Sequence, residues 1–96
     1  MEVSVFARLH ARPGQRDAVR QAILEVQGPT REEPGCLAFG AYHSVRDPDE
    51  FVIHSQWTNP AAFDRHVELP HTRLFVAAVE PWLDHHLTVS LAQRIS

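Results

Sequence analysis

Apolar residues change their spacing along this chain, and the order of these changes limits the folds available to it. Residues 3–10 carry apolar side chains at every second position, which is the period of a β-strand. From Gln15 onward, after a break at Pro13-Gly14, the apolar positions follow a helical period. The helical positions are Val19, Ala22, Ile23 and Val26. The first third of the chain is therefore predicted to form one strand and one helix.

Glycine and proline divide the middle of the chain. Gly28-Pro29 is expected to kink or interrupt the helix before Glu33-Pro34-Gly35 ends it. Residues 37–44 and 50–57 are rich in β-formers, and a polar turn at residues 46–49 joins them. These two segments are predicted to form a hairpin.

A second helical region follows, and proline divides it in two. Asn59-Pro60 is a helix-start signal, because the residue before proline avoids helical geometry and proline fits the first helical position. Pro70 is expected to break this helix, and the second piece is expected to end at Pro81. Alternating apolar residues then predict a last strand, at Leu87, Val89 and Leu91.

The predicted order is strand, helix, strand, strand, helix, strand, in one domain that spans residues 1–96. This order suits the ferredoxin-like arrangement of the α+β class, a four-stranded antiparallel sheet with both helices on one face. The second face of such a sheet stays open, and here it would carry Phe6, Tyr42 and Val52. Because an exposed apolar face favours association, we expect a homodimer whose sheets pack together as a dimeric α/β barrel.

Length and charge narrow the choice of partners. A 96-residue domain buries only about 60–65% of the surface of its unfolded chain, so a partner subunit would add to a modest core. The formal net charge is −3 and the arginines are scattered, so nucleic acid is not an expected partner. The chain shows no basic leader segment and no apolar run long enough to cross a bilayer, which predicts a soluble cytoplasmic protein without a membrane partner. Cys36 is the only cysteine, so no internal disulfide can form.

Several short motifs occur in the order and spacing of a known family. They are REEPGCL at residues 31–37, Phe51-Val52-Ile53 leading to Trp57, then His66, Pro70-His71 and Phe75. Together they resemble the antibiotic biosynthesis monooxygenase family, which includes quinol monooxygenases. The resemblance covers nearly the whole chain, and it implies the ferredoxin-like dimer described above.

The resemblance also implies an activity. Members of this family oxygenate small phenolic, quinol or polyketide-like aromatic substrates with molecular oxygen and without a cofactor. Ser55 stands where many relatives carry a glutamate, which favours the alternative of a non-catalytic, dimeric module that binds a small ligand or is associated with stress. Residues 6–9 lack the asparagine of the haem-degrading members, so haem degradation is not expected. A cofactor-free isomerase of a small metabolite is a third alternative.

His66 and His71 are the candidate catalytic residues, because the base for a phenolic proton should titrate near neutrality. Pro70 would place His71 in the first turn of a new helix, where the positive end of the helix dipole favours a neutral imidazole. His66 would lie near the end of the preceding helix, where the bias is opposite. Each effect is worth about 0.3–1 kcal/mol at an exposed site. Both histidines also fit purely structural, hydrogen-bonded roles.

An apolar pocket would bind an aromatic substrate and exclude water. Its candidate walls are Trp57, Phe63, Leu74, Phe75 and Trp82. Trp57 is better explained as a core residue, since large aromatic side chains mostly fill space. The histidines show neither HxxxH nor HExxH spacing and the glycines show no GxGxxG pattern, so neither a metal nor a nucleotide cofactor is predicted.

Overall fold

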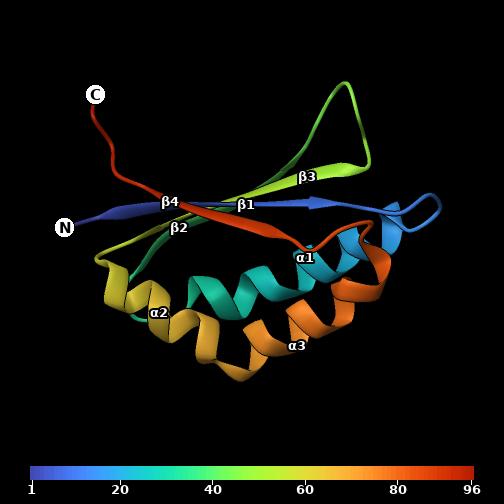
Figure 1. Cartoon of the computed structure of the whole chain (residues 1–96). Helices are drawn as coiled ribbons and strands as arrows, with labels where there is room; N and C mark the ends of the chain where they lie inside the picture. The colour runs from blue at the N-terminus through green and yellow to red at the C-terminus, as the bar shows by residue number, and fades with distance from the viewer.

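The computed structural model describes residues 1–96 and contains the predicted strands and helices in the predicted order (Figure 1). The strands are β1 (Val3–His10), β2 (Cys36–His43), β3 (Glu50–Trp57) and β4 (Thr88–Ala92). The helices are α1 (Arg16–Arg31), α2 (Pro60–Glu68) and α3 (Pro70–Val79), and a short 3-10 turn, η1 (Glu80–Trp82), follows α3. None of these helices has the length and apolar character needed to cross a membrane.

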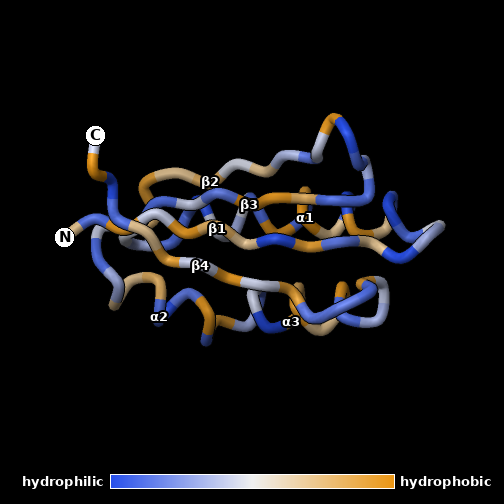
Figure 2. Tube along the Cα trace, turned by 45° about the horizontal axis from the view of Figure 1, so that its top comes forward, coloured by the Kyte–Doolittle hydropathy of each residue, from blue (hydrophilic) through white to orange (hydrophobic).

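The four strands form one antiparallel sheet in the order β2-β3-β1-β4. Figure 2 shows them side by side in this order, with β1 and β3 in the centre. Val5 of β1 lies opposite Ser55 of β3 on one side and Leu91 of β4 on the other. The helices all lie on one face of the sheet, and the other face is open (Figure 1). The predicted ferredoxin-like fold is therefore confirmed.

Helix α1 continues through Pro29 to Arg31, so the predicted interruption at Gly28-Pro29 does not occur. Pro29 lies in the last turn, where its missing amide removes only one hydrogen bond near the helix end. The next residue, Thr30, is fully buried, and its hydroxyl donates to the Val26 carbonyl at 2.7 Å. Packing of this last turn against the rest of the protein therefore holds it in helical geometry.

The break between α2 and α3 occurs where proline predicted it. Leu69 has an extended backbone (φ −72°, ψ 147°) and separates the two helices, and Pro70 takes the first position of α3. Asn59 caps the start of α2, where its side-chain oxygen accepts a hydrogen bond from the Ala62 amide at 2.9 Å. The break brings the last turn of α2 beside the first turn of α3, and the rings of His66 and His71 lie 6.2 Å apart.

Gly35 lets the chain pass close to the start of α2. Its φ is +90°, and a Cβ at this position would lie 2.7 Å from the Cβ of Ala62. The Gly35 carbonyl also accepts a hydrogen bond from the Thr58 amide at 2.9 Å. Only glycine fits both the backbone conformation and the close approach. This turn places the end of α1 beside α2, where the candidate site forms.

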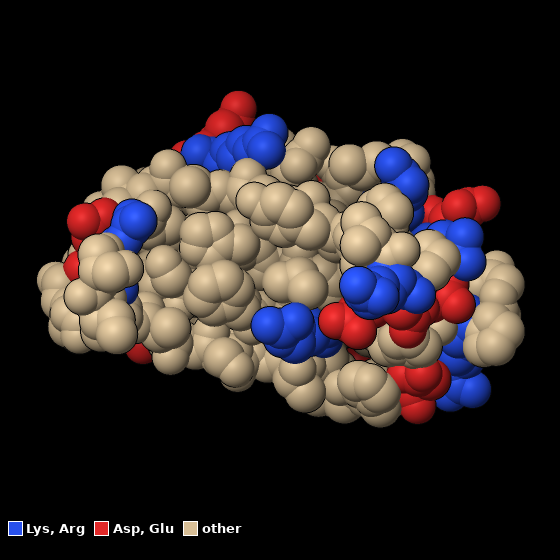
Figure 3. Space-filling view, turned by 90° about the horizontal axis from the view of Figure 1, so that it is seen from above, with Lys and Arg blue, Asp and Glu red and all other residues tan.

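Alternation along β1 separates a covered face from an open one. Val5 and Leu9 are buried beneath the helices, whereas Phe6 stacks on His54 of β3 on the opposite face, with ring centroids 4.8 Å apart. Tyr42, which is 62% exposed, pairs with Val52 on that same open face. Figure 3 views this face and shows few charged side chains over its middle. The three residues expected on the open face are therefore found there.

Candidate active site

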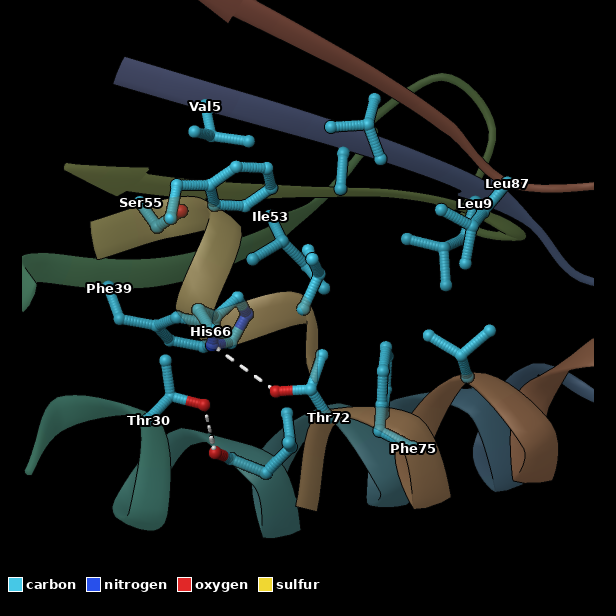
Figure 4. Close-up of a pocket in the computed structure, with 16 residues that line it drawn as sticks. Val5, Leu9, Thr30, Phe39, Ile53, Ser55, His66, Thr72, Phe75 and Leu87 are labelled. Atoms are coloured by element: carbon cyan, nitrogen blue, oxygen red, sulfur yellow. Dashed lines mark hydrogen bonds between the residues drawn. The ribbon is translucent and has the colours of Figure 1, made fainter. Parts of the chain in front are cut away.

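An apolar cavity of about 100 Å³ lies between the sheet and the helices (Figure 4). Twelve of its sixteen lining residues are hydrophobic. They include Val5, Leu9, Phe39 and Ile53 from the sheet, and Phe63 and Phe75 from the helices. Such a cavity can bury an apolar ring and exclude water from it.

Four polar residues, Thr30, Ser55, His66 and Thr72, interrupt this apolar lining. Thr30 donates within α1, and the Ser55 hydroxyl oxygen accepts a hydrogen bond from Nε1 of the Trp57 indole at 2.9 Å. The hydroxyl oxygen of Thr72 lies 3.2 Å from Nδ1 of His66. Nε2 of His66 has no hydrogen-bond partner in the protein. His66 therefore keeps one ring nitrogen free for a bound molecule.

Glu33 joins the two candidate histidines. Its Oε2 atom lies 2.7 Å from Nδ1 of His66 and 2.7 Å from Nε2 of His71. Glu33 follows the end of α1, His66 lies in the last turn of α2, and His71 lies in the first turn of α3. The side chains of Glu33, His66 and His71 are 6%, 12% and 27% exposed. A carboxylate buried to this extent is stabilised by the two N–H groups that donate to it.

The bond to Glu33 sets the tautomer of His66. An ionised carboxylate can only accept, so Nδ1 carries the proton and Nε2 keeps its lone pair. The imidazole packs against both Trp57 and Phe63, whose ring centroids are 4.7 Å and 5.7 Å from its own. His66 is therefore held in a fixed orientation at the cavity wall, and its free nitrogen can take a proton from a bound molecule.

Phe63, Phe75 and His66, all expected at the site, line the cavity. Trp57 is fully buried behind His66, in a small core cluster, and does not line the cavity. Trp57 contacts the ring of His66 and so helps to orient it, but Trp57 does not itself contact the cavity. The structure thus brings these four residues together, with three at the cavity wall and Trp57 behind His66.

The other expected site residues lie apart from the cavity. His71 and Leu74 line a separate groove between α1 and α3, where Leu74 is 71% exposed. His71 reaches the site only through its bond to Glu33. Trp82 belongs to η1 and packs against the main core cluster. Leu74 and Trp82 therefore do not contact the cavity that His66 lines.

Glu33 and Thr72 are site residues that the sequence pattern did not single out. Glu33 belongs to the REEPGCL segment, where Pro34-Gly35 was interpreted only as a helix end. Glu33 could have been found from the sequence, because it is a carboxylate in a segment that both ends a helix and carries a family motif. Ser55 supplies no acid to the site, because its hydroxyl oxygen accepts the indole N–H of Trp57. The acid of this site is therefore Glu33, from the end of α1.

The same three residues are the ones that could hold a metal ion. The donor atoms of Glu33, His66 and His71 all lie within 4.8 Å of one another. Cys36 is near in sequence, but burial, and secondarily the charge of Glu33, raises the pKa of its thiol. A protonated thiol is neither a nucleophile nor a ready metal ligand.

Taken together, the fold and site define a small α+β domain with an apolar cavity and a carboxylate-oriented histidine at the cavity wall. Residues 2–78 match the sequence profile of the antibiotic biosynthesis monooxygenase family. This chain therefore belongs to that family, as its motifs indicated.

Relatives of this chain share nearly its whole length. The protein named "Putative monooxygenase Rv0793" from Mycobacterium tuberculosis is 33% identical over 93% of this chain and 87% of its own length. "Probable quinol monooxygenase YgiN" from Escherichia coli is 28% identical over 81% of this chain and 85% of its own length. The solved structure of Rv0793 superimposes with a TM-score of 0.94 at 29% identity, covering 100% of this chain and 97% of that one. PA3566 from Pseudomonas aeruginosa superimposes with a TM-score of 0.91 at 25% identity, covering 99% and 95%.

Proposed function

We propose that this protein is a cofactor-independent monooxygenase of a small phenolic or quinol-like aromatic substrate, with His66 as its base. The observation that carries the proposal is the bond of 2.7 Å from Nδ1 of His66 to Glu33, which leaves Nε2 free at the wall of an apolar cavity. Membership of the monooxygenase family supports the reaction class. His71 does not line the cavity, so its role is to position Glu33.

The reaction begins with proton transfer. Nε2 of His66 removes the proton of the substrate hydroxyl, and the carboxylate of Glu33 stabilises the imidazolium that forms. Triplet oxygen reacts poorly with a closed-shell phenol, but the phenolate can give it one electron. The resulting radical pair combines to form a carbon–oxygen bond, and the apolar cavity keeps water away from the anion.

The remaining steps need no external reductant. For a quinol, the peroxide formed on a ring carbon loses its outer oxygen as water, and the products are a hydroxyquinone and water. One hydrogen of that water comes from His66 and the other from the ring carbon, so His66 returns to its neutral form. All four electrons that reduce the oxygen molecule come from the substrate.

The size of the cavity favours a single aromatic ring. Its volume is about 100 Å³, whereas an apolar cavity of about 150 Å³ holds benzene. A one-ring phenol or quinol therefore fits with small movements of the walls. A multi-ring polyketide-like substrate would require a larger opening between β4 and the helices, where Val89 is half exposed.

The open sheet face supports the further proposal of a homodimer. Phe6, Tyr42 and Val52 lie on this face, and its middle carries few charges (Figure 3). Burying this surface against a second copy would remove its apolar area from water. Sedimentation analysis should give a dimer that Val52→Asp dissociates. Leu24→Asp, at an exposed position of α1, is the matched control.

Oxygen uptake by metal-free protein tests the enzymatic proposal against a panel of phenols, quinols, naphthols and anthrones. We expect uptake with a one-ring substrate, and its loss in His66→Gln but not in His85→Gln, which changes an exposed histidine outside the cavity. Product formation without oxygen uptake would replace the proposal with an isomerase. Binding seen by tryptophan fluorescence, with no turnover of any compound, would replace it with a ligand-binding module.

A further inference from the structure

Glu33, His66 and His71 offer a carboxylate oxygen and two imidazole nitrogens at one point, where the end of α1 meets the break between α2 and α3. We propose that these residues bind a divalent transition-metal ion, and that the bound ion turns Nε2 of His66 from a proton acceptor into a donor. The metal site stands on the geometry alone. Its consequence, a metal-inhibited base, rests on the function proposed above.

The donor set selects the kind of ion. Two imidazoles and one carboxylate suit Zn²⁺, Fe²⁺, Ni²⁺ and Cu²⁺, whereas Ca²⁺ and Mg²⁺ prefer ligand sets made of oxygen. Three protein ligands also leave coordination positions open for water or another small ligand. Zn²⁺ is therefore a suitable probe of the site, with Co²⁺ as a coloured substitute.

The positions of the three atoms allow an ion with small side-chain movements. Around a tetrahedral ion with bonds of about 2.0–2.2 Å, neighbouring ligand atoms lie about 3.3–3.6 Å apart. Oε2 of Glu33 is now 2.7 Å from each nitrogen, so it must withdraw by about 0.6–0.9 Å. One donor atom from each of the three residues lies within 4.8 Å of the others, so the two imidazoles must approach by at most about 1.5 Å. Rotation of side chains at helix ends supplies shifts of this size.

The ion has a route that does not pass through the apolar cavity. His71 lines a groove of about 280 Å³ between α1 and α3, together with Glu25 and Leu74. The His71 side chain is 27% exposed, against 12% for His66. Hydrated ions can therefore reach the site by way of His71, the one of the three ligands that lines this groove, and water can fill open coordination positions on that side.

Metal binding changes which nitrogen of His66 carries a proton. In the metal-free site, Nδ1 of His66 and Nε2 of His71 donate to Glu33. An ion needs the lone pairs of these same atoms, so each proton moves to the other nitrogen of its ring. No net proton is gained or lost when both imidazoles start neutral. Nε2 of His66 then carries a hydrogen toward the cavity and can no longer accept the proton of a substrate.

The surroundings of the two imidazoles predict that the metal ion binds reversibly. Metal-binding histidines usually donate their second N–H to a protein acceptor, and losing that partner weakens binding about 10–100-fold. Nε2 of His66 and Nδ1 of His71 have no such acceptor in the protein. The affinity should therefore be well below that of a structural zinc site, and a chelator should remove the ion.

Titration of the full chain with Zn²⁺ against a chromophoric chelator tests the site. We expect one ion per chain, and visible absorption from Co²⁺ in a coordination of four or five ligands. Glu33→Gln keeps the shape of the side chain and should lower the affinity for Zn²⁺ at least about tenfold. Loss of a direct ligand should weaken binding no less than loss of a group that only hydrogen-bonds to a ligand. His71→Gln should do the same, and thermal unfolding will show that both variants are folded.

Two variants control for adventitious binding. His85→Gln removes an exposed histidine that bonds only to Asp84 and the neighbouring backbone, and Cys36→Ser removes the one thiol near Glu33. Both should bind Zn²⁺ like the unaltered chain. Equal affinity in Glu33→Gln and the unaltered chain would overturn the site, as would loss of binding in Cys36→Ser.

Nitrogen NMR of the histidine side chains tests whether metal binding moves the proton of His66 to Nε2, and it needs no assay of activity. Zn²⁺ should move the Nε2 signal of His66 from the unprotonated to the protonated range. A metal-bound protein whose Nε2 stays unprotonated would overturn the switch. Because neither readout uses oxygen uptake, failure of the monooxygenase proposal on metal-free protein remains distinguishable from failure of the metal site.

Discussion

Nδ1 of His66 lies 2.7 Å from Oε2 of Glu33, although 33 residues separate them in the chain. The bond connects the end of α1 to the last turn of α2, and His71 donates to the same oxygen from α3. In the mechanism proposed above, a buried carboxylate held in this way orients the imidazole and stabilises the imidazolium that forms. The orientation of the proposed base therefore depends on Glu33, which does not line the cavity.

Glu33→Gln should lower kcat for oxygen uptake by about 10–100-fold, less than the roughly 10²–10⁴-fold contributed by a general base itself, with little change in KM. The amide keeps the size of the side chain but removes the charge that stabilises the imidazolium of His66. Steady-state kinetics on a one-ring quinol measures both constants. Glu68→Gln, at an exposed position of α2, is the control. A change confined to KM would show that Glu33 acts in binding only.

Ser55→Ala should destabilise the protein by about 1–3 kcal/mol, because it leaves the buried indole N–H of Trp57 without a partner. Urea unfolding measures the change. Trp57→Phe removes the donor, so the same serine substitution should cost much less in that background. Equal costs in the two backgrounds would mean that the hydrogen bond does not contribute to stability.

Gly35→Ala should destabilise the protein more than Gly14→Ala. Both glycines have positive φ, at +90° and +84°, so each substitution carries a backbone cost of about 1–2 kcal/mol. At Gly35 the new methyl group would also meet Ala62 at 2.7 Å, whereas nothing lies within 4 Å at Gly14. Thermal unfolding of the two variants separates the steric clash from the backbone term. Equal shifts in Tm would contradict the close approach of the chain to α2.

His10 connects the end of β1 to two loops by charge-assisted hydrogen bonds. Its Nε2 lies 2.7 Å from Oδ2 of Asp47, and its Nδ1 lies 2.5 Å from Oδ2 of Asp84. Both bonds raise the pKa of His10 above its ordinary value of 6.5, and the bond to Asp47 has the larger effect. The bond to His10 in turn lowers the pKa of Asp47 below 3.8. The ring of His85 stacks near His10 at 6.4 Å.

Stability should therefore fall as the pH rises through the raised pKa of His10. Because this pKa is higher in the folded state, the contribution of His10 is complete below 6.5 and is lost at higher pH. The contribution of Asp47 has the opposite sign and is lost as the pH falls below 3.8. Urea unfolding across this range should show the alkaline decline in the unaltered chain and a smaller one in His10→Gln. An identical pH profile for both proteins would exclude His10 as the cause.

The order of strands and helices was predictable because it depends on local patterns. Alternating apolar residues defined β1, and the Leu69-Pro70 break followed from backbone sterics alone. The interruption expected at Gly28-Pro29 failed because burial of Thr30 holds the last turn of α1 in place. Pro29 disfavours a helix but removes only one backbone hydrogen bond here. Tertiary packing of the neighbouring Thr30 can therefore override this local preference.

The fold class, the family and the two histidines beside a proline break could be predicted from the chain alone, because periodicity and short motifs are properties of neighbouring residues. Three relations became visible only in the folded chain: His66 lines the cavity, His71 faces a separate groove, and Glu33 joins them. These relations depend on how α1 packs beside α2 and α3. A contact between residues 33 positions apart leaves no period in the sequence, since it forms only when buried surfaces bring distant segments together.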